Sequence, residues 1–194
     1  MDKPGEKKAT IPVGVVVRRA PGVTRWAKWA WKAVAVMPGA GAADWRELRR
    51  DGDAVEFHAA TLEMELWRSD TEAYLVALSN EPPSVYVIMR RAPPGGAGLA
   101  AEMGMEIVRV TASPYEAQDY GDSGEDIVEP VPAPPGLVAF IREFVARHHV
   151  DEAFVKRRRD KRRTDLKEDG KGDARIRQDA DVYRSPGSRK GALH

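Results

Sequence analysis

Short apolar runs separated by turn residues fill the first two thirds of the chain. Residues 11–19 are β-branched and apolar up to two arginines, which predicts a strand buried on both faces. Gly14 within this run indicates a bulge or a close backbone approach. In residues 54–67 the apolar positions from 62 onward alternate with glutamates, so one face of this strand is core and the other is solvent. Further strands are expected at residues 31–37, 72–79, 84–91 and 105–112, and residues 45–50 fit either a strand or one helical turn.

The last of these strands runs directly into a short helix within residues 108–120. Ser113 suits the N-cap and Pro114 suits the first helical position. Glu116 follows three residues after the N-cap, which completes a capping box. Residues four apart share one helix face. The pairs on this helix are Tyr115 with Asp119 and Glu116 with Tyr120.

A longer helix is expected at residues 137–149, where apolar residues recur with the helical period. The segment before it, residues 125–135, ends in a series of prolines and predicts an extended, polyproline-like strap. Residues 92–104 are rich in Pro, Gly and Ala and predict a connecting loop.

These elements predict an α+β fold. We expect an antiparallel β-meander of five to seven strands, because the short turns leave no room for parallel crossovers. A short capped helix and a C-terminal amphipathic helix complete it. Residues 11–155 form this domain, residues 1–10 are a disordered N-terminus, and residues 156–194 are a basic, disordered tail.

Composition narrows the chemistry and the compartment. The chain has no cysteine, which excludes disulfides, thiol nucleophiles and zinc–thiolate sites. No apolar run approaches the roughly 18 residues of a membrane span, and the first ten residues lack an apolar signal region. We therefore expect a cytoplasmic protein without a membrane span.

The net charge of +1 hides an asymmetry along the chain. Residues 150–194 carry 14 Lys or Arg and 9 Asp or Glu, a net +5, so the rest of the chain carries −4. The basic tail could hold nucleic acid through phosphate contacts. Its interleaved acids and single aromatic, Tyr183, favour a solvated tail or an acidic partner instead. The densest cations are Lys156, Arg157, Arg158, Arg159, Lys161, Arg162 and Arg163.

Candidate chemistry gathers around the short helix. Glu116 and Asp119 could act as general acid and base. Capping accounts for Glu116 without a substrate, however, and no calcium-loop spacing is present. His148 and His149 with Glu152 offer too few ligands for a catalytic metal, and no His-Glu-x-x-His motif occurs. We assign no catalytic residue, no metal site and no cofactor.

Two groups of residues are candidate contacts with a protein partner. Tyr115, Asp119 and Tyr120 form an acidic and tyrosyl surface that capping does not explain. Trp26 and Trp29 fall in a loop, and tryptophan is enriched in binding hot spots.

Several segments resemble a bacterial family of unknown function whose genes often neighbour those of molybdenum-dependent formate dehydrogenase. The resemblance spans about residues 11–159 and carries no enzymatic activity or catalytic residue. It implies an accessory role near a redox enzyme, with a formate dehydrogenase subunit as partner. The matching segments are Ile11-Pro-Val-Gly-Val-Val-Val, Trp31-Lys-Ala-Val-Ala-Val-Met-Pro-Gly, Ala59-Ala-Thr-Leu, Glu72-Ala-Tyr, Pro82-Pro-Ser-Val-Tyr-Val, Val110-Thr-Ala-Ser-Pro-Tyr-Glu-Ala-Gln-Asp-Tyr and Arg147-His-His-Val.

The sequence therefore favours a non-catalytic protein-binding accessory protein, one that assists assembly or maturation of a formate dehydrogenase-type molybdoenzyme. One alternative is a small enzyme that uses the carboxylates near Glu116 and Asp119. The other is nucleic-acid binding through the basic tail.

Overall fold

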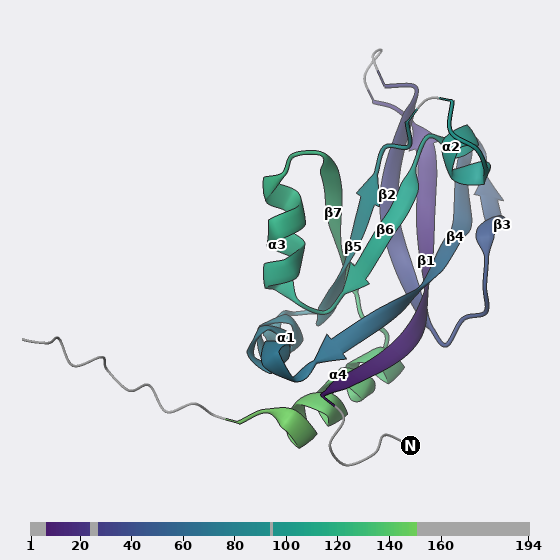
Figure 1. Cartoon of the computed structure of the whole chain (residues 1–194). Coiled ribbons are helices and arrows are strands. Elements are labelled where there is room, and N and C mark those ends of the chain that lie inside the picture. Colours follow the sequence, from purple (N-terminus) through teal and green to yellow (C-terminus); the bar gives the residue numbers. More distant parts are fainter. Residues whose placement is uncertain (1–6, 24–26, 94, 151–194) are drawn as a thin grey trace, which may run out of the picture. The chain divides into compact units, whose positions relative to one another are not determined.

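The computed structural model describes residues 7–23, 27–93 and 95–150, and in these ranges seven antiparallel strands form two sheets (Figure 1). They belong to the unit Met1–Asp151. The first sheet has the strand order β2-β1-β4-β3 and the second has the order β6-β5-β7. The strands of the first sheet are β1 (Lys8–Pro21), β2 (Trp29–Pro38), β3 (Asp44–Asp51) and β4 (Ala54–Trp67). Those of the second are β5 (Ser84–Arg90), β6 (Glu106–Thr111) and β7 (Asp126–Pro132).

Helices lie at the ends and on one outer face of this framework. They are the 3-10 helix η1 (Arg68–Asp70) and the α-helices α1 (Thr71–Ser79), α2 (Leu99–Met103), α3 (Pro114–Asp122) and α4 (Pro135–His148). The α+β class, the antiparallel strands and the C-terminal helix are thus confirmed.

The core lies between the two sheets. Val13, Val15 and Val17 of β1 are fully buried in one apolar cluster with residues of β5 and α4. Alternate residues of a strand point to opposite faces, so Arg18 of β1 lies on the outer face of the first sheet, where it is exposed. α3 packs against β5, β6 and β7.

Pairing between distant strands completes the first sheet. β1 pairs with β2 and β3 pairs with β4 as hairpins, but β1 also pairs with β4 from Lys8 to Arg19. β1 begins at Lys8, so the last residues of the segment 1–10 belong to the strand. The basic tail at 156–194 lies outside the described residues.

Three local predictions were wrong. Residues 72–79, expected as a strand, belong to α1, because the residues that it buries (Thr71, Ala73, Tyr74 and Ala77) follow helical spacing. The expected proline strap contains strand β7, which tolerates its prolines because it is an edge strand. The expected loop at 92–104 contains the short helix α2. Residues 45–50, left open between strand and helix, lie in β3.

Candidate protein-binding face

The N-terminus of α3 is capped by a side chain. Ser113 Oγ accepts a hydrogen bond from the backbone N–H of Glu116 at 3.2 Å, and Pro114 is the first helical residue. The expected N-cap is confirmed.

The carboxylate of Glu116 does not complete the expected capping box. Thr111 Oγ1 donates to Glu116 Oε2 at 2.6 Å, and Arg109 Nε forms an ion pair with Glu116 Oε1. The backbone N–H of Ser113 donates instead to Thr111 Oγ1 at 3.0 Å. The hydroxyl of Thr111 therefore accepts the hydrogen bond from the N–H of Ser113 that a capping box assigns to the carboxylate of Glu116. Alternation along β6 places Arg109 and Thr111 on one strand face, a signal that the sequence already contained.

This ion pair belongs to a longer chain of charges. Glu65 of β4 accepts from Lys8 Nζ at 2.6 Å, and its other oxygen lies 4.0 Å from Arg109 Nη2. The hydrogen bond from Lys8 holds the pKa of Glu65 below its usual value. Glu116 is thus part of a network that links β1, β4, β6 and α3.

A buried tyrosine lies near the same network. Tyr74 of α1 is 1% exposed, and its hydroxyl oxygen accepts from the backbone N–H of Trp67 at 2.9 Å. Burial raises the pKa of Tyr74 to about 12, so this phenol stays protonated and structural.

The outward face of α3 carries the residues that capping does not explain. Tyr115 is 56% exposed and Asp119 is exposed, whereas Ala117 is buried and Tyr120 is half-buried. Of the three predicted contact residues on this helix, Tyr115 and Asp119 therefore point to solvent.

Exposed apolar side chains also lie on α1, which contacts α3 and lies at the lower end of α3 in Figure 1. Leu75 and Val76 of α1 are 40% and 41% exposed. We define the α1/α3 face as Leu75, Val76, Tyr115 and Asp119.

The chain segments that contain α1 and α3 are acidic between their flanking arginines. Residues 69–89 and 110–141 contain nine Asp or Glu and no Lys or Arg. Two of these acids have cationic partners, because Glu116 pairs with Arg109, and Asp126 pairs with Arg90 through hydrogen bonds of 2.7 and 2.8 Å. The bond from Arg90 lowers the pKa of Asp126. Exposed apolar residues on acidic chain segments suit a basic protein surface.

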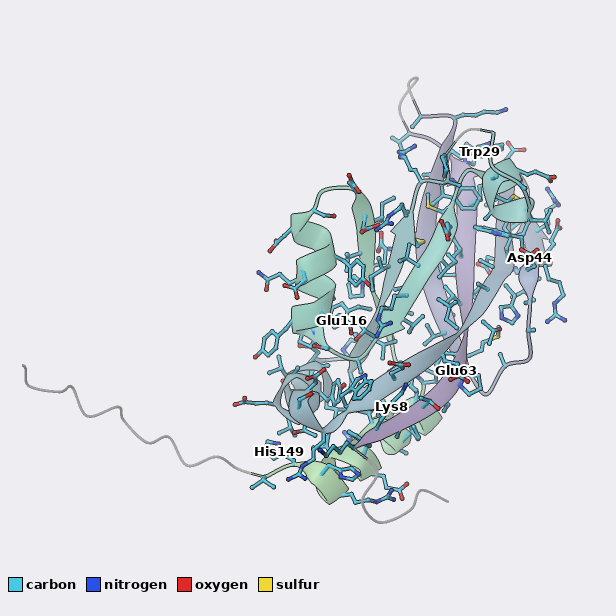
Figure 2. The ribbon with its side chains drawn as sticks, in the orientation of Figure 1. Lys8, Trp29, Asp44, Glu63, Glu116 and His149 are labelled. Atoms are coloured by element: carbon cyan, nitrogen blue, oxygen red, sulfur yellow. The ribbon has the colours of Figure 1, made fainter. Side chains whose placement is uncertain are left out.

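Trp29 lies at the other end of the sheets, far from Lys8 (Figure 2). Trp26 lies outside the described residues. Trp29 is half-buried, with the guanidinium of Arg19 at 4.5 Å from its ring centroid. Arg19 also lies 5.3 Å from the ring of Phe57, and its Nε is buried without a hydrogen-bond partner. One face of Trp29 is therefore engaged within the domain.

A buried histidine lies on the outer face of the first sheet beneath residues 39–41. His58 is 2% exposed, and its Nε2 lies 2.9 Å from Thr61 Oγ1, which itself donates to the carbonyl of Gly41 at 2.7 Å. Because the hydroxyl proton of Thr61 is used, His58 Nε2 must donate. Nδ1 then carries a lone pair, and it is buried without a partner. Burial, followed by the charge of Arg46, lowers the pKa of His58 below its ordinary 6.5.

Acidification is expected to weaken the fold through His58. As the pH falls below 6.5, His58 is protonated in the unfolded chain before it is protonated in the folded chain. The free energy of unfolding therefore falls as the pH drops. Urea unfolding from about pH 7.5 to about pH 5.5 measures this slope. A His58→Gln variant should show a shallower slope, and equal slopes would contradict the role given to this residue.

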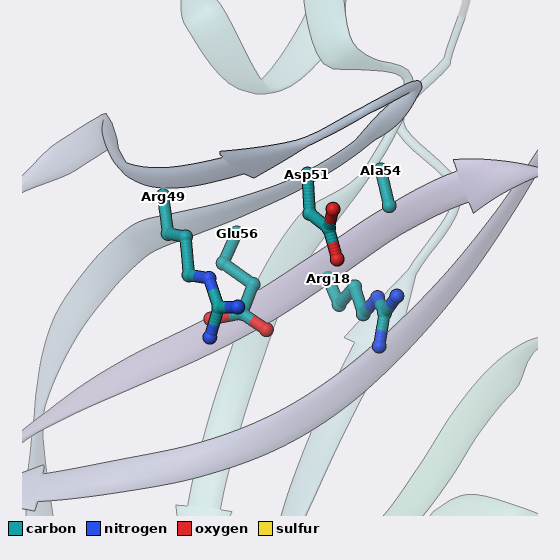
Figure 3. Close-up of a pocket in the computed structure, with 5 residues that line it drawn as sticks. All are labelled: Arg18, Arg49, Asp51, Ala54 and Glu56. Carbon is teal, nitrogen blue, oxygen red and sulfur yellow. The ribbon is translucent and has the colours of Figure 1, made fainter.

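A shallow hollow of about 60 Å³ lies on the same outer face (Figure 3). Arg18, Arg49, Asp51, Ala54 and Glu56 line it. It is far smaller than the roughly 300 Å³ of the smallest ligand clefts, so it does not suit an organic substrate.

Metal ligands do not converge within the described ranges, where no group of three or more His, Asp or Glu could hold an ion. His149 Nδ1 lies 3.1 Å from Thr71 Oγ1. Glu152, the third residue of the weighed metal site, lies outside the described ranges.

Comparison with known proteins places the chain in a family. Residues 12–158 match the model of a family described as a protein of unknown function, DUF3305, and the chain belongs to that family. Neither the curated proteins nor the solved structures gave a match. None of the helices in the described part of the chain has the length and apolar composition that crossing a membrane requires.

Proposed function

We propose that this is a cytoplasmic, non-catalytic protein that binds another protein through the α1/α3 face. The observation that carries the proposal is the exposure of Tyr115 and Asp119 on α3, and of Leu75 and Val76 on α1, a helix that contacts α3. Tyrosine anchors with apolar neighbours and a charged rim are the usual anatomy of a protein interface.

The partner in this proposal is a basic surface on a formate dehydrogenase-type molybdoenzyme, whose assembly or maturation the protein assists. The resemblance of the matching segments to a family encoded near such enzymes supports this choice of partner. It is an association between genes, so the partner itself requires a biochemical test.

The geometry of Glu116 supports a binding role over the alternative of a small enzyme. General acid–base work requires carboxylates that converge on a substrate. The oxygens of Glu116 are held by Arg109 and Thr111, whereas Asp119 lies on the exposed face. The carboxylate of Glu116 is therefore bonded within the domain and that of Asp119 faces solvent, so the two do not converge on one substrate.

Co-purification from the native cells tests the proposal. A tagged chain with Tyr115→Ala and Asp119→Lys should retain at least about tenfold less formate dehydrogenase subunit than the natural chain, because both the anchor and the charge are lost. Leu48→Ala with Asp53→Lys is the matched control, since both residues are exposed on the β3–β4 hairpin. Equal recovery with the α3 variant, or equal loss with the control, would refute the proposal.

A further inference from the structure

A cationic β-ribbon lies away from the α1/α3 face. β1 pairs with β4 only as far as Arg19, but its pairing with β2 continues to Pro21 opposite Trp29. The last residues of this hairpin are therefore a two-stranded ribbon that projects beyond the rest of the sheet (Figure 1).

The outer face of this ribbon is flat and positively charged. Arg18 and Lys32 are cross-strand partners, and both are exposed. Lys28, also exposed, directly precedes β2, and its backbone C=O accepts a hydrogen bond from the N–H of Gly22 at 3.1 Å. Its Nζ lies 5.9 Å from the centroid of the Trp29 ring. The residues that follow Arg18 and precede Lys32 on the outer face are small, namely Ala20 and Ala30.

These three cations are available to an external anion. Within the described residues, Arg18, Lys28 and Lys32 form no ion pair with a carboxylate. Glu56 is the cross-strand neighbour of Arg18 on β4, and Arg49 lies beyond it on β3. Glu56 and Asp51 mark the acidic border of the face at the hollow of Figure 3.

The wider charge layout agrees with this assignment. Residues 7–50 contain ten Lys or Arg and two Asp or Glu. Residues 51–150 contain six Lys or Arg and seventeen Asp or Glu. The domain is thus polarised, and its positive part includes the whole ribbon.

We propose that the end of the β1–β2 hairpin, with Arg18 and Lys32 on its outer face and Lys28 just before β2, binds the phosphate backbone of a double-stranded nucleic acid. Dense, regularly repeated phosphates suit a face that offers positive charge and close backbone approach. The hairpin is two-stranded beyond Arg19, and a two-stranded ribbon fits the width of a duplex groove.

The aromatic residues argue for a duplex over a single strand. Single strands are bound largely by stacking on exposed rings. Trp29 and Trp31 lie on the opposite face of the ribbon, where Arg19 lies over Trp29 and 5.9 Å from Trp31. Among the described residues at the end of the ribbon, Val23 is an exposed apolar side chain, and it alone would bury little area in a lipid surface.

Fluorescence anisotropy with a labelled DNA duplex of two helical turns tests this proposal on the full chain. Replacing Arg18, Lys28 and Lys32 by glutamine should weaken binding at least about tenfold at low salt. It should also reduce the slope of log K against log salt, measured from about 50 to about 200 mM, by roughly 2 to 3. Glu56→Gln should strengthen binding about threefold, because it removes the acid next to Arg18.

Three controls separate this site from other causes of binding. Replacing exposed Arg68, Arg142 and Arg147 by glutamine removes the same charge at the opposite end of the domain, near α4, and should leave the slope within about 0.5 of the natural value (Figure 1). Arg18→Lys with Lys28→Arg and Lys32→Arg preserves the charge and should retain binding. In a chain whose cations at residues 156–163 have been replaced by glutamine, the ribbon substitutions should still reduce the slope of log K against log salt.

Four results would overturn the proposal. One is an unchanged slope in the ribbon variant, and another is an equal loss in the variant of Arg68, Arg142 and Arg147. The third is tighter binding of a single strand of the same length. The fourth is ribbon-dependent binding of phosphatidylglycerol vesicles without binding of the duplex, which would identify the ribbon as a lipid-binding site.

Discussion

Replacing Gly14 by alanine is expected to lower the free energy of unfolding by about 3 kcal/mol, at the upper end of what overpacking costs. A Cβ atom at this position would lie 2.5 Å from His58 Nε2 and 2.8 Å from the Cβ of Ala40. His58 cannot move aside freely, because it is buried and bonded to Thr61. Urea unfolding followed by tryptophan fluorescence measures the change.

Two further variants show whether this steric account of Gly14 is correct. Gly136→Ala adds the same methyl group where nothing lies within 4 Å, so it should not destabilise the fold. His58→Ala in the Gly14→Ala background should recover more than about 1 kcal/mol of the loss, because the nearest clash disappears. Additive losses in the double variant would show that Gly14 is required for another reason.

Replacing Glu116 by alanine is expected to lower the free energy of unfolding by about 2 kcal/mol. The change removes the carboxylate that pairs with Arg109 Nε and leaves the hydroxyl of Thr111 without its acceptor. A buried donor that loses its acceptor costs about 1 to 3 kcal/mol. The midpoint of urea unfolding at constant slope gives this difference.

Asp119→Ala is the matched control, because it removes an exposed carboxylate from the same helix. Its effect should stay within about 0.5 kcal/mol, as for most surface substitutions. If Glu116→Ala were as mild as Asp119→Ala, Glu116 would not be a structural anchor, and a catalytic role for it would regain support.

The strands that alternate or are β-branched could be predicted from the sequence, but residues 72–79 could not. Tyr74, Val76 and Leu78 alternate with Ala73, Leu75 and Ala77, so both faces of a strand would have been apolar. Such a run fits a buried strand and a helix equally well. Packing decides between them, because Tyr74 and Ala77 become buried on one side of α1.

The position of a strand within its sheet also could not be predicted from the local sequence. Pro130 and Pro132 argue against a central strand, yet β7 pairs with β5 from Asp126 to Pro132 and has its other edge free of strand partners in the second sheet. Edge position depends on long-range pairing, which no short window of residues contains.

The candidate face was predicted in part. Helical spacing correctly put Tyr115 and Asp119 on one face of a capped helix, and Ser113 caps it as expected. The exposure of Leu75 and Val76 on a helix that contacts α3 could not be predicted, because the sequence of α1 also fits a strand. The partner for Glu116 was missed because a capping box describes contacts within one helix, whereas Arg109 and Thr111 reach it from β6.

The most direct test of the binding account is a titration of the purified chain against purified formate dehydrogenase subunit at low and at physiological salt. The account predicts that Tyr115→Ala with Asp119→Lys raises the Kd at least about tenfold, and that salt weakens the natural chain more than the variant. Equal Kd values for the two chains would contradict the claim that the α1/α3 face is the contact surface.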